Sequence, residues 1–164
     1  MNIPDPETLR RTYLEQVRPH VPEPILAIGF LSPGNTMRSA VTGSATSHLI
    51  FKASPLAALL FNRRKRATRT ARLAESPAQL VAVGPTSAYL FPFPAGQEFA
   101  VTAPPAVWVR AHTRVTAGEK GRFARKIHVE QASGEQQDFE IVEAKTWAGF
   151  SDAMLALLLD PIAA

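Results

Sequence analysis

Alternating apolar and polar residues in the last third of the chain predict a group of β-strands. The first predicted strand, 107–115, carries Val107, Val109, Ala111, Thr113 and Val115 on one face and Trp108, Arg110, His112 and Arg114 on the other. The same period of two recurs over 123–129 and again over 138–141. This period is typical of strands with one buried face. We therefore predict three consecutive antiparallel strands, joined by turns at 118–121 and 133–135.

Across this predicted meander, side chains of opposite charge face one another. The basic side chains Arg110, His112 and Arg114 are expected opposite Lys126 and His128, which in turn lie opposite Asp138 and Glu140. Each pair of opposite charges on neighbouring strands contributes about 0.2–1 kcal/mol. Because Trp108 shares the face of Arg110 and His112, we expect it to be a partly exposed contact residue.

After residue 145 the apolar positions change to a helical spacing. The stripe consists of Trp147, Phe150, Met154, Leu157 and Leu158. Apolar residues spaced three and four apart lie on one face of a helix. The pattern predicts one amphipathic helix over 146–160 that caps the open end of the sheet.

The N-terminal part is predicted to contain a helix, three strands and an insertion. Asp5 as the capping residue and Pro6 at the first helical position predict a helix over 5–18, inside a proline-rich lead-in over 1–22. Strands are predicted at 25–31, 79–83 and 87–93, the last with Tyr89, Phe91 and Phe93 on one face. The sheet therefore extends over 25–143. It is interrupted by the insertion 44–75, in which a helix is predicted over 55–73.

The residues from 80 to 91, Leu-Val-Ala-Val-Gly-Pro-Thr-Ser-Ala-Tyr-Leu-Phe, resemble a strand pair of the bacterial pleckstrin-homology-like (PH-like) family. A further strand pair around a glycine-containing turn and a C-terminal helix follow, as in that family. The resemblance covers roughly the last half of the chain, with 25–31 as an outlying strand. It implies an α+β, mainly β fold: an antiparallel barrel or sandwich of about seven strands with a capping C-terminal helix. It also implies binding of peptides, proteins or acidic lipid headgroups, since few members are enzymes.

Composition and charge are those of one globular domain over 1–164 with an uneven charge distribution. The chain has 164 residues, no cysteine and a net charge of +4. Residues 61–75 carry a net +5, residues 110–130 a net +4 and residues 131–164 a net −5. No signal peptide is recognised, and the longest apolar run, 49–61, is too short to span a bilayer. We expect a cytoplasmic protein without a transmembrane span that can lie at the inner face of the membrane.

Basic residues are the strongest candidates for a binding site. The predicted set is Arg63, Arg64, Lys65, Arg66, Arg69 and Arg72, supplemented by Arg110, His112 and Arg114. Basic residues beside an apolar segment are typical of helices that bind anionic bilayers. An acidic protein is an alternative partner, and nucleic acid is a less favoured one. The cluster is also compatible with a solvated helix face that has no partner.

No sequence pattern predicts catalysis, a metal or a cofactor. The histidines His20, His48, His112 and His128 lack the spacing of a zinc site, and no nucleophile motif or phosphate-binding glycine loop is present. We therefore predict a non-enzymatic binding module that recruits an anionic membrane surface or a protein partner. Two alternatives stay open. One is an interaction or oligomerisation module that uses 49–61, and the other is a small enzyme or ligand-binding barrel without a recognisable motif.

Overall fold

The structure, a computed structural model, describes residues 5–34, 78–93, 98–122, 124–142 and 149–160. Its strands are β1 (Ala27–Pro33), β2 (Ala78–Val83), β3 (Ser87–Phe93), β4 (Ala106–Val109), β5 (Thr113–Lys120), β6 (Ala124–Gln131) and β7 (Gln136–Val142). The described helices are α1 (Pro6–Val17) and α6 (Asp152–Leu159), with the short 3₁₀ helices η1 (Arg18–His20) and η2 (Arg110–His112). The strands form one antiparallel sheet in the order β4-β3-β2-β1-β7-β6-β5. The prediction of a mainly β, antiparallel fold is confirmed.

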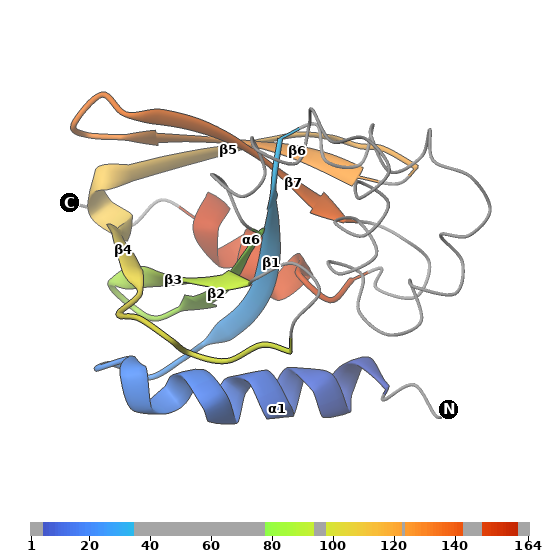
Figure 1. The fold of residues 1–164 in the computed structure, drawn as a ribbon. Helices are drawn as coiled ribbons and strands as arrows, with labels where there is room; N and C mark the ends of the chain where they lie inside the picture. Colours follow the sequence, from blue (N-terminus) through green and yellow to red (C-terminus); the bar gives the residue numbers. More distant parts are fainter. Residues whose placement is uncertain (1–4, 35–77, 94–97, 123, 143–148, 161–164) are drawn as a thin grey trace, which may run out of the picture.

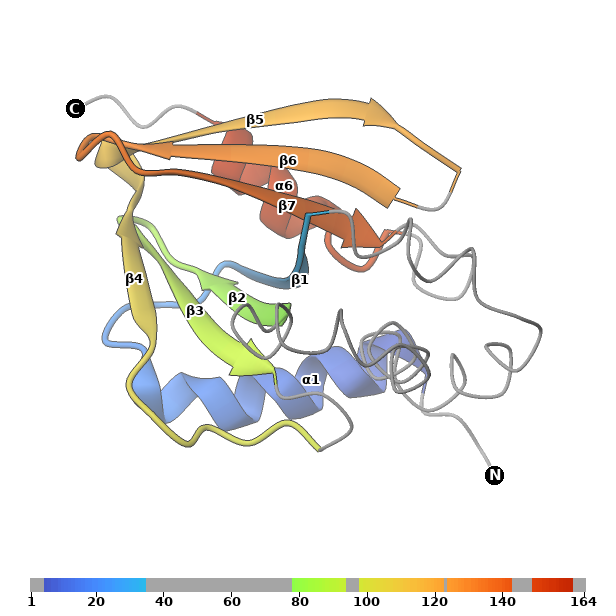
Figure 2. The ribbon, with the colours of Figure 1, turned by 45° about the horizontal axis from the view of Figure 1, so that its top comes forward.

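Strand β1 joins the two halves of the sheet. Its residues from Ala27 to Leu31 pair with β2, whereas Ser32 and Pro33 pair with β7. The first half contains β1–β4, and the second half contains β5–β7. Figure 1 and Figure 2 show the second half as a layer on one side of α6, while β2–β4 lie on the other side and α1 runs beneath them. This arrangement leaves one face of β5–β7 directed away from the core.

Two apolar clusters follow from the alternation of side chains along the first half-sheet. On the face toward α1, the buried residues include Phe30, Leu80, Tyr89, Phe91, Phe93, Phe99 and Phe150. On the face toward the second half-sheet and α6, they include Leu31, Val81, Leu90, Trp108, Ile127, Val129, Phe139, Ile141 and Met154. Consecutive residues such as Phe30 and Leu31 therefore enter different clusters, as a period of two requires. The predicted common face of Tyr89, Phe91 and Phe93 is confirmed.

Helix α1 covers the first cluster with one of its faces. The Asp5 carboxylate accepts hydrogen bonds from the backbone N–H groups of Glu7 and Thr8, which caps the helix. Tyr13 packs edge-on against Phe30 with ring centroids 5.5 Å apart. The Arg10 guanidinium lies 4.8 Å from the centroid of the Phe150 ring and donates a hydrogen bond to the Phe150 carbonyl. These contacts connect the start of the chain to the segment before α6.

Helix α6 packs between the two halves of the sheet. Met154, Leu155 and Leu158 are buried there, in contact with β1, β2 and β5. Just before the helix, the buried Ser151 hydroxyl accepts a hydrogen bond from the Phe30 backbone N–H at 3.0 Å. This hydrogen bond satisfies a buried donor on β1 and fixes the start of α6 against the strand.

The prediction of one continuous strand over 107–115 is wrong. The chain leaves the first half-sheet at Val109, turns through η2 and enters the second half-sheet at Thr113. The predicted buried face is reversed in β4, where Val107 and Val109 are 49% and 43% exposed and Trp108 is 5% exposed. Trp108 packs against Phe139 with ring centroids 5.6 Å apart, so it is a core residue rather than an exposed contact. A pattern of period two does not say which face is buried, and here the larger side chain occupies the space between the half-sheets.

The turn between β2 and β3 is held by a carboxylate from outside the sheet. Glu23 accepts hydrogen bonds from the backbone N–H groups of Thr86 and Ser87, at 3.2 and 2.9 Å, and from the Thr86 hydroxyl at 2.8 Å. A side chain at Gly84 would collide with Glu23, because an added Cβ would lie 2.3 Å from a carboxylate oxygen. The turn and the segment after η1 therefore depend on each other.

Replacing Glu23 by glutamine should reduce the loss of stability in acid. Desolvation raises the pKa of Glu23, but the hydrogen bonds from Thr86 and Ser87 outweigh it and hold that pKa below its ordinary value of 4.5. A lowered pKa stabilises the fold above the unfolded-state pKa, and this contribution is lost as pH falls through the folded-state pKa. We expect Glu23→Gln to be less stable than the wild type at neutral pH, and the difference to shrink below about pH 4. Urea denaturation at a series of pH values measures the difference in the free energy of unfolding between the two proteins. A difference that is independent of pH would contradict the prediction.

Several predicted features lie outside the described residues. They are the insertion 44–75 with its predicted helix 55–73, Phe123, and the predicted start of the last helix with Trp147.

Candidate functional site

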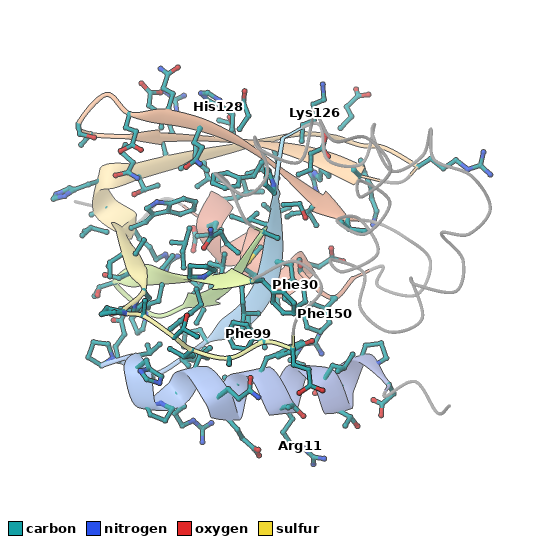
Figure 3. All side chains as sticks on the ribbon, viewed as in Figure 1. Arg11, Phe30, Phe99, Lys126, His128 and Phe150 are labelled. Carbon is teal, nitrogen blue, oxygen red and sulfur yellow. The ribbon has the colours of Figure 1, made fainter. Side chains whose placement is uncertain are left out.

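The outward face of β5–β7 carries rows of polar side chains whose order is fixed by strand register. Thr116 pairs with His128, and His128 pairs with Asp138. In the neighbouring row, Lys126 pairs with Glu140, which pairs with Ser32 of β1. Figure 3 shows Lys126 and His128 projecting from this layer, on the side of the molecule away from α1. The predicted apposition of these two basic residues with Asp138 and Glu140 is therefore confirmed.

His128 and Asp138 form a hydrogen-bonded pair. The Nδ1 atom of His128 lies 2.6 Å from a carboxylate oxygen of Asp138. Their side chains are 43% and 76% exposed, so water screens the interaction and its contribution to stability is small. Its effect is to orient the imidazole ring, which directs Nε2 away from Asp138.

Glu140 differs from the other residues of this face, because it is buried. Its exposed fraction is 4%, and that of the neighbouring Ser32 is 1%. In the described part of the chain, the Ser32 hydroxyl is a buried polar group without a hydrogen-bond partner. The sequence places Glu140 on the polar face of its strand, and alternation alone gives no sign that this carboxylate is buried.

A pocket lies over the same rows of residues. Its volume is about 460 Å³, and it is lined by Gly34, Thr116, Ala117, Gly118, Lys126, Ile127, His128, Asp138, Phe139 and Glu140. Pockets that hold small ligands occupy about 300–1,000 Å³. We call this site the polar pocket. Sequence reasoning missed it, because its residues come from three strands, β5, β6 and β7, and from Gly34 after β1.

Basic residues are concentrated at one end of the second half-sheet. At the end where β5 turns into β6, the basic residues are Lys120, Arg122, Arg125 and Lys126, with Glu119 as the one acidic residue between 118 and 126. Lys120, Arg122 and Lys126 are exposed. At the other end, Glu130 and Glu135 lie on either side of the turn between β6 and β7. We call the first group the basic end. The sequence shows this charge as part of a basic segment, but only the hairpin places it at one end of a sheet.

The residues Arg110, His112 and Arg114, predicted as one face of a strand, do not lie on one strand. Arg110 is half-buried and donates hydrogen bonds to the carbonyl oxygens of Gly84, Pro85 and Leu157, at 3.1, 3.0 and 2.5 Å. His112 ends η2 and is exposed. Arg114 is exposed and pairs with Glu130 of β6 rather than with Lys126 or His128. The reason is the turn at η2, which separates residues that a continuous strand would have aligned.

The other predicted binding residues, Arg63, Arg64, Lys65, Arg66, Arg69 and Arg72, lie outside the described residues. The same holds for the apolar run 49–61.

Within the described ranges, no group of three or more histidine or acidic side chains is close enough to hold a metal ion. Within the same ranges, no helix combines the length and apolar character needed to cross a bilayer. No protein-family model and no curated protein sequence matches the chain.

Proposed function

We propose that the protein is a non-enzymatic binding module that recruits an anionic membrane surface through the basic end of β5 and β6. The observation that carries this proposal is the concentration of Lys120, Arg122, Arg125 and Lys126 at one end of the second half-sheet, against the carboxylates of Glu119 and of Glu140, which pairs with Lys126. A basic residue near an anionic bilayer contributes about 1 kcal/mol to binding. Four such residues on one hairpin are therefore sufficient for salt-sensitive, reversible attachment.

The local geometry of the hairpin supports this role. Arg125 donates a hydrogen bond from Nε to the Gly118 carbonyl at 2.9 Å, across a register shift between Ala117 and Lys120. This bond fixes the backbone from which the exposed residues project. The basic end can therefore present its charges to a flat surface without a large loss of conformational freedom.

We propose further that the module is PH-like. Three features support this: the strands follow one another as a meander on each side of β1, β1 pairs with both halves, and α6 packs between them near the end of the chain. In the PH-like family a C-terminal helix plugs the open end of a curved sheet. A cytoplasmic location, peripheral to the inner face of the membrane, agrees with this proposal because anionic lipids are concentrated there.

The predicted cluster at 63–72 would add to the same attraction. It contains six further basic residues, and each that lies near an anionic surface would contribute about 1 kcal/mol. An acidic protein is the alternative partner for the same charges. Nucleic acid is the less favoured partner, and its phosphates would be bound by the same charges without sequence preference.

Sedimentation with lipid vesicles tests the proposal. We expect the wild-type protein to pellet with phosphatidylserine-containing vesicles but not with phosphatidylcholine vesicles, and to be released by salt. The double substitution Lys120→Glu and Arg122→Glu should lower the affinity about 30-fold or more, because two attractive charges become repulsive. Arg11→Glu is a single-charge control: Arg11 is exposed on α1, and Figure 3 shows it projecting from the side of the molecule away from β5–β7.

Three results would contradict the proposal. One is equal binding to both kinds of vesicle. Another is full binding by the double variant, which would place the contact at 63–72 or elsewhere. The third is a loss in Arg11→Glu that is about half that of the double variant in free energy, since it reverses one charge rather than two; this would mean that only net charge matters. Circular dichroism of each variant establishes that it is folded.

A further inference from the structure

We infer that the edge of β4 is an interaction surface for a second copy of this chain, and that the two copies pair their β4 strands antiparallel about a twofold axis. This surface belongs to the first half-sheet, whereas the proposed membrane contact belongs to the second, so the inference goes beyond the proposed function. It rests on the backbone groups along the edge of β4, on the uncharged sequence of that edge and on its exposed valines.

Strand β4 directs part of its backbone away from the sheet. In the described part of the chain its neighbour is β3, and no strand lies on its other side; Figure 1 and Figure 2 both show it along the border of the molecule. Val109 pairs with Ser87 of β3. The next residue, Arg110, donates its backbone N–H to the Thr86 carbonyl. Because hydrogen bonds to one neighbour alternate along an antiparallel strand, the backbone groups of Val107 and Val109 point away from β3, where a further strand can pair with them.

The edge at β4 lacks the features that commonly protect a free strand. Residues 104–109 read Pro-Pro-Ala-Val-Trp-Val, without a charged side chain, and Val107 and Val109 are 49% and 43% exposed. The strand at the other end of the sheet order, β5, carries exposed Arg114 and Lys120 and has a register shift. Charged side chains and irregularities of this kind keep edge strands from pairing with other chains. Of the two edges, β4 is therefore the one that accepts a partner.

The hydrogen-bonding groups of this edge are complementary to themselves. The Val109 carbonyl already accepts a hydrogen bond from the Thr113 hydroxyl at 2.9 Å. Pro105, two residues before Val107 and thus on the same side of the strand, has no N–H to donate. When Val107 of each copy lies opposite the partner's Val107, Val109 lies opposite the partner's Pro105. The N–H groups of Val107 and Val109 then each face a carbonyl, and the missing donor of Pro105 falls opposite the carbonyl that is already engaged.

An unrelated peptide matches this edge less well than a second copy does. A peptide without proline leaves its own carbonyl opposite Pro105 without a donor, and an unpaired carbonyl in an interface costs free energy. Symmetric pairing avoids this cost. It also brings Val107 against the partner's Val107 and Val109 against the partner's Pro105, so apolar surface is buried on both copies. The interface uses the same patch twice, so the assembly closes as a dimer.

Sedimentation velocity of the full-length protein, from about 10 μM to 1 mM, tests the inference. We expect a reversible monomer–dimer equilibrium, because an edge of four residues buries less surface than a tight dimer requires. Val107→Lys should weaken the dimer by about tenfold or more, since it places two like charges directly opposite each other. Leu26→Lys is the matched control. Leu26 precedes β1 and is 53% exposed, so the same charge is added outside the edge and the dimer should be unchanged.

Single cysteines test the register. The chain has no cysteine, so an introduced thiol can form a disulfide only with its counterpart in a second copy. Facing residues of a hydrogen-bonded antiparallel pair have Cα atoms about 5.5 Å apart, a distance that a disulfide spans. Val107→Cys should therefore give a disulfide-linked dimer under mild oxidation. In Val109→Cys the two thiols lie about 14 Å apart along the strands, and cross-linking should be about tenfold slower or more.

The inference is overturned if the wild type stays a monomer up to the highest concentration. A dimer that survives Val107→Lys, or that Leu26→Lys weakens equally, also overturns it, because the contact then lies on another surface such as the apolar run 49–61. Equal rates of cross-linking in Val107→Cys and Val109→Cys contradict the register and have the same consequence. Circular dichroism verifies the fold of each variant. The double variant Lys120→Glu and Arg122→Glu should dimerise like the wild type while losing vesicle binding, so the two proposals fail independently.

Discussion

Replacing Phe30 by alanine is expected to lower the free energy of unfolding by about 3–5 kcal/mol. Phe30 is 7% exposed, and its ring stacks on Phe150 with a centroid distance of 5.1 Å. It also meets Tyr13 and Phe93 edge-on, at 5.5 and 5.7 Å. Removing the ring takes away one partner from α1, one from β3 and one from the segment before α6. The result is a cavity at the point where these elements meet, and the backbone cannot collapse to fill it without moving all of them.

Chemical denaturation of the purified variant measures this effect. Val107→Ala is the control, because it also shortens an apolar side chain, but one that is 49% exposed. Its effect should stay within about 0.5 kcal/mol. Similar losses for the two variants would mean that the cluster under α1 is not a packed core.

Replacing Met154 by alanine is expected to cost about 2–5 kcal/mol and to change the effect of a substitution at Gly29. Met154 is fully buried on α6, and an added Cβ at Gly29 of β1 would lie 2.7 Å from its sulfur and 2.9 Å from the Ser151 hydroxyl oxygen. Gly29 therefore permits the close approach of α6 to β1. Gly29→Ala alone should destabilise the protein by about 1–3 kcal/mol through overpacking.

A double-mutant cycle tests this coupling. In the Met154→Ala background the sulfur is gone, so Gly29→Ala should cost less than in the wild type, by about 0.5 kcal/mol or more. The free energies of unfolding of the wild type, the two single variants and the double variant are compared under one set of conditions. Strict additivity would contradict the close contact between α6 and β1.

The hairpin of β2 and β3 could be predicted from the local sequence pattern alone. Both strands are continuous apolar or alternating runs, and the Gly84–Thr86 turn between them has residues that favour a reversal. The pairing of His128 with Asp138 was predictable for a similar reason, because a short turn fixes the register of a hairpin. These features depend on residues that are close in sequence.

The wrong predictions concern residues whose neighbours in the structure come from distant parts of the chain. Arg110 has the pattern of an exposed strand residue, yet it donates to carbonyl groups of the β2–β3 turn and of α6. Trp108 shares its predicted face, yet it is buried between the half-sheets. Periodicity separates two faces of a strand, but the side that becomes buried depends on which elements pack against it.

The sequence by itself determined that this protein is mainly β and antiparallel, where β2 and β3 begin and end, and which charges oppose one another in the β6–β7 hairpin. It determined these because turns, caps and alternation act over a few residues. Only the tertiary structure decided that β1 joins two half-sheets, that the chain turns at η2, and that Glu140 lies buried beside a pocket. Those features require contacts between segments far apart in the chain. The stability of such contacts depends on how the strands and helices pack together.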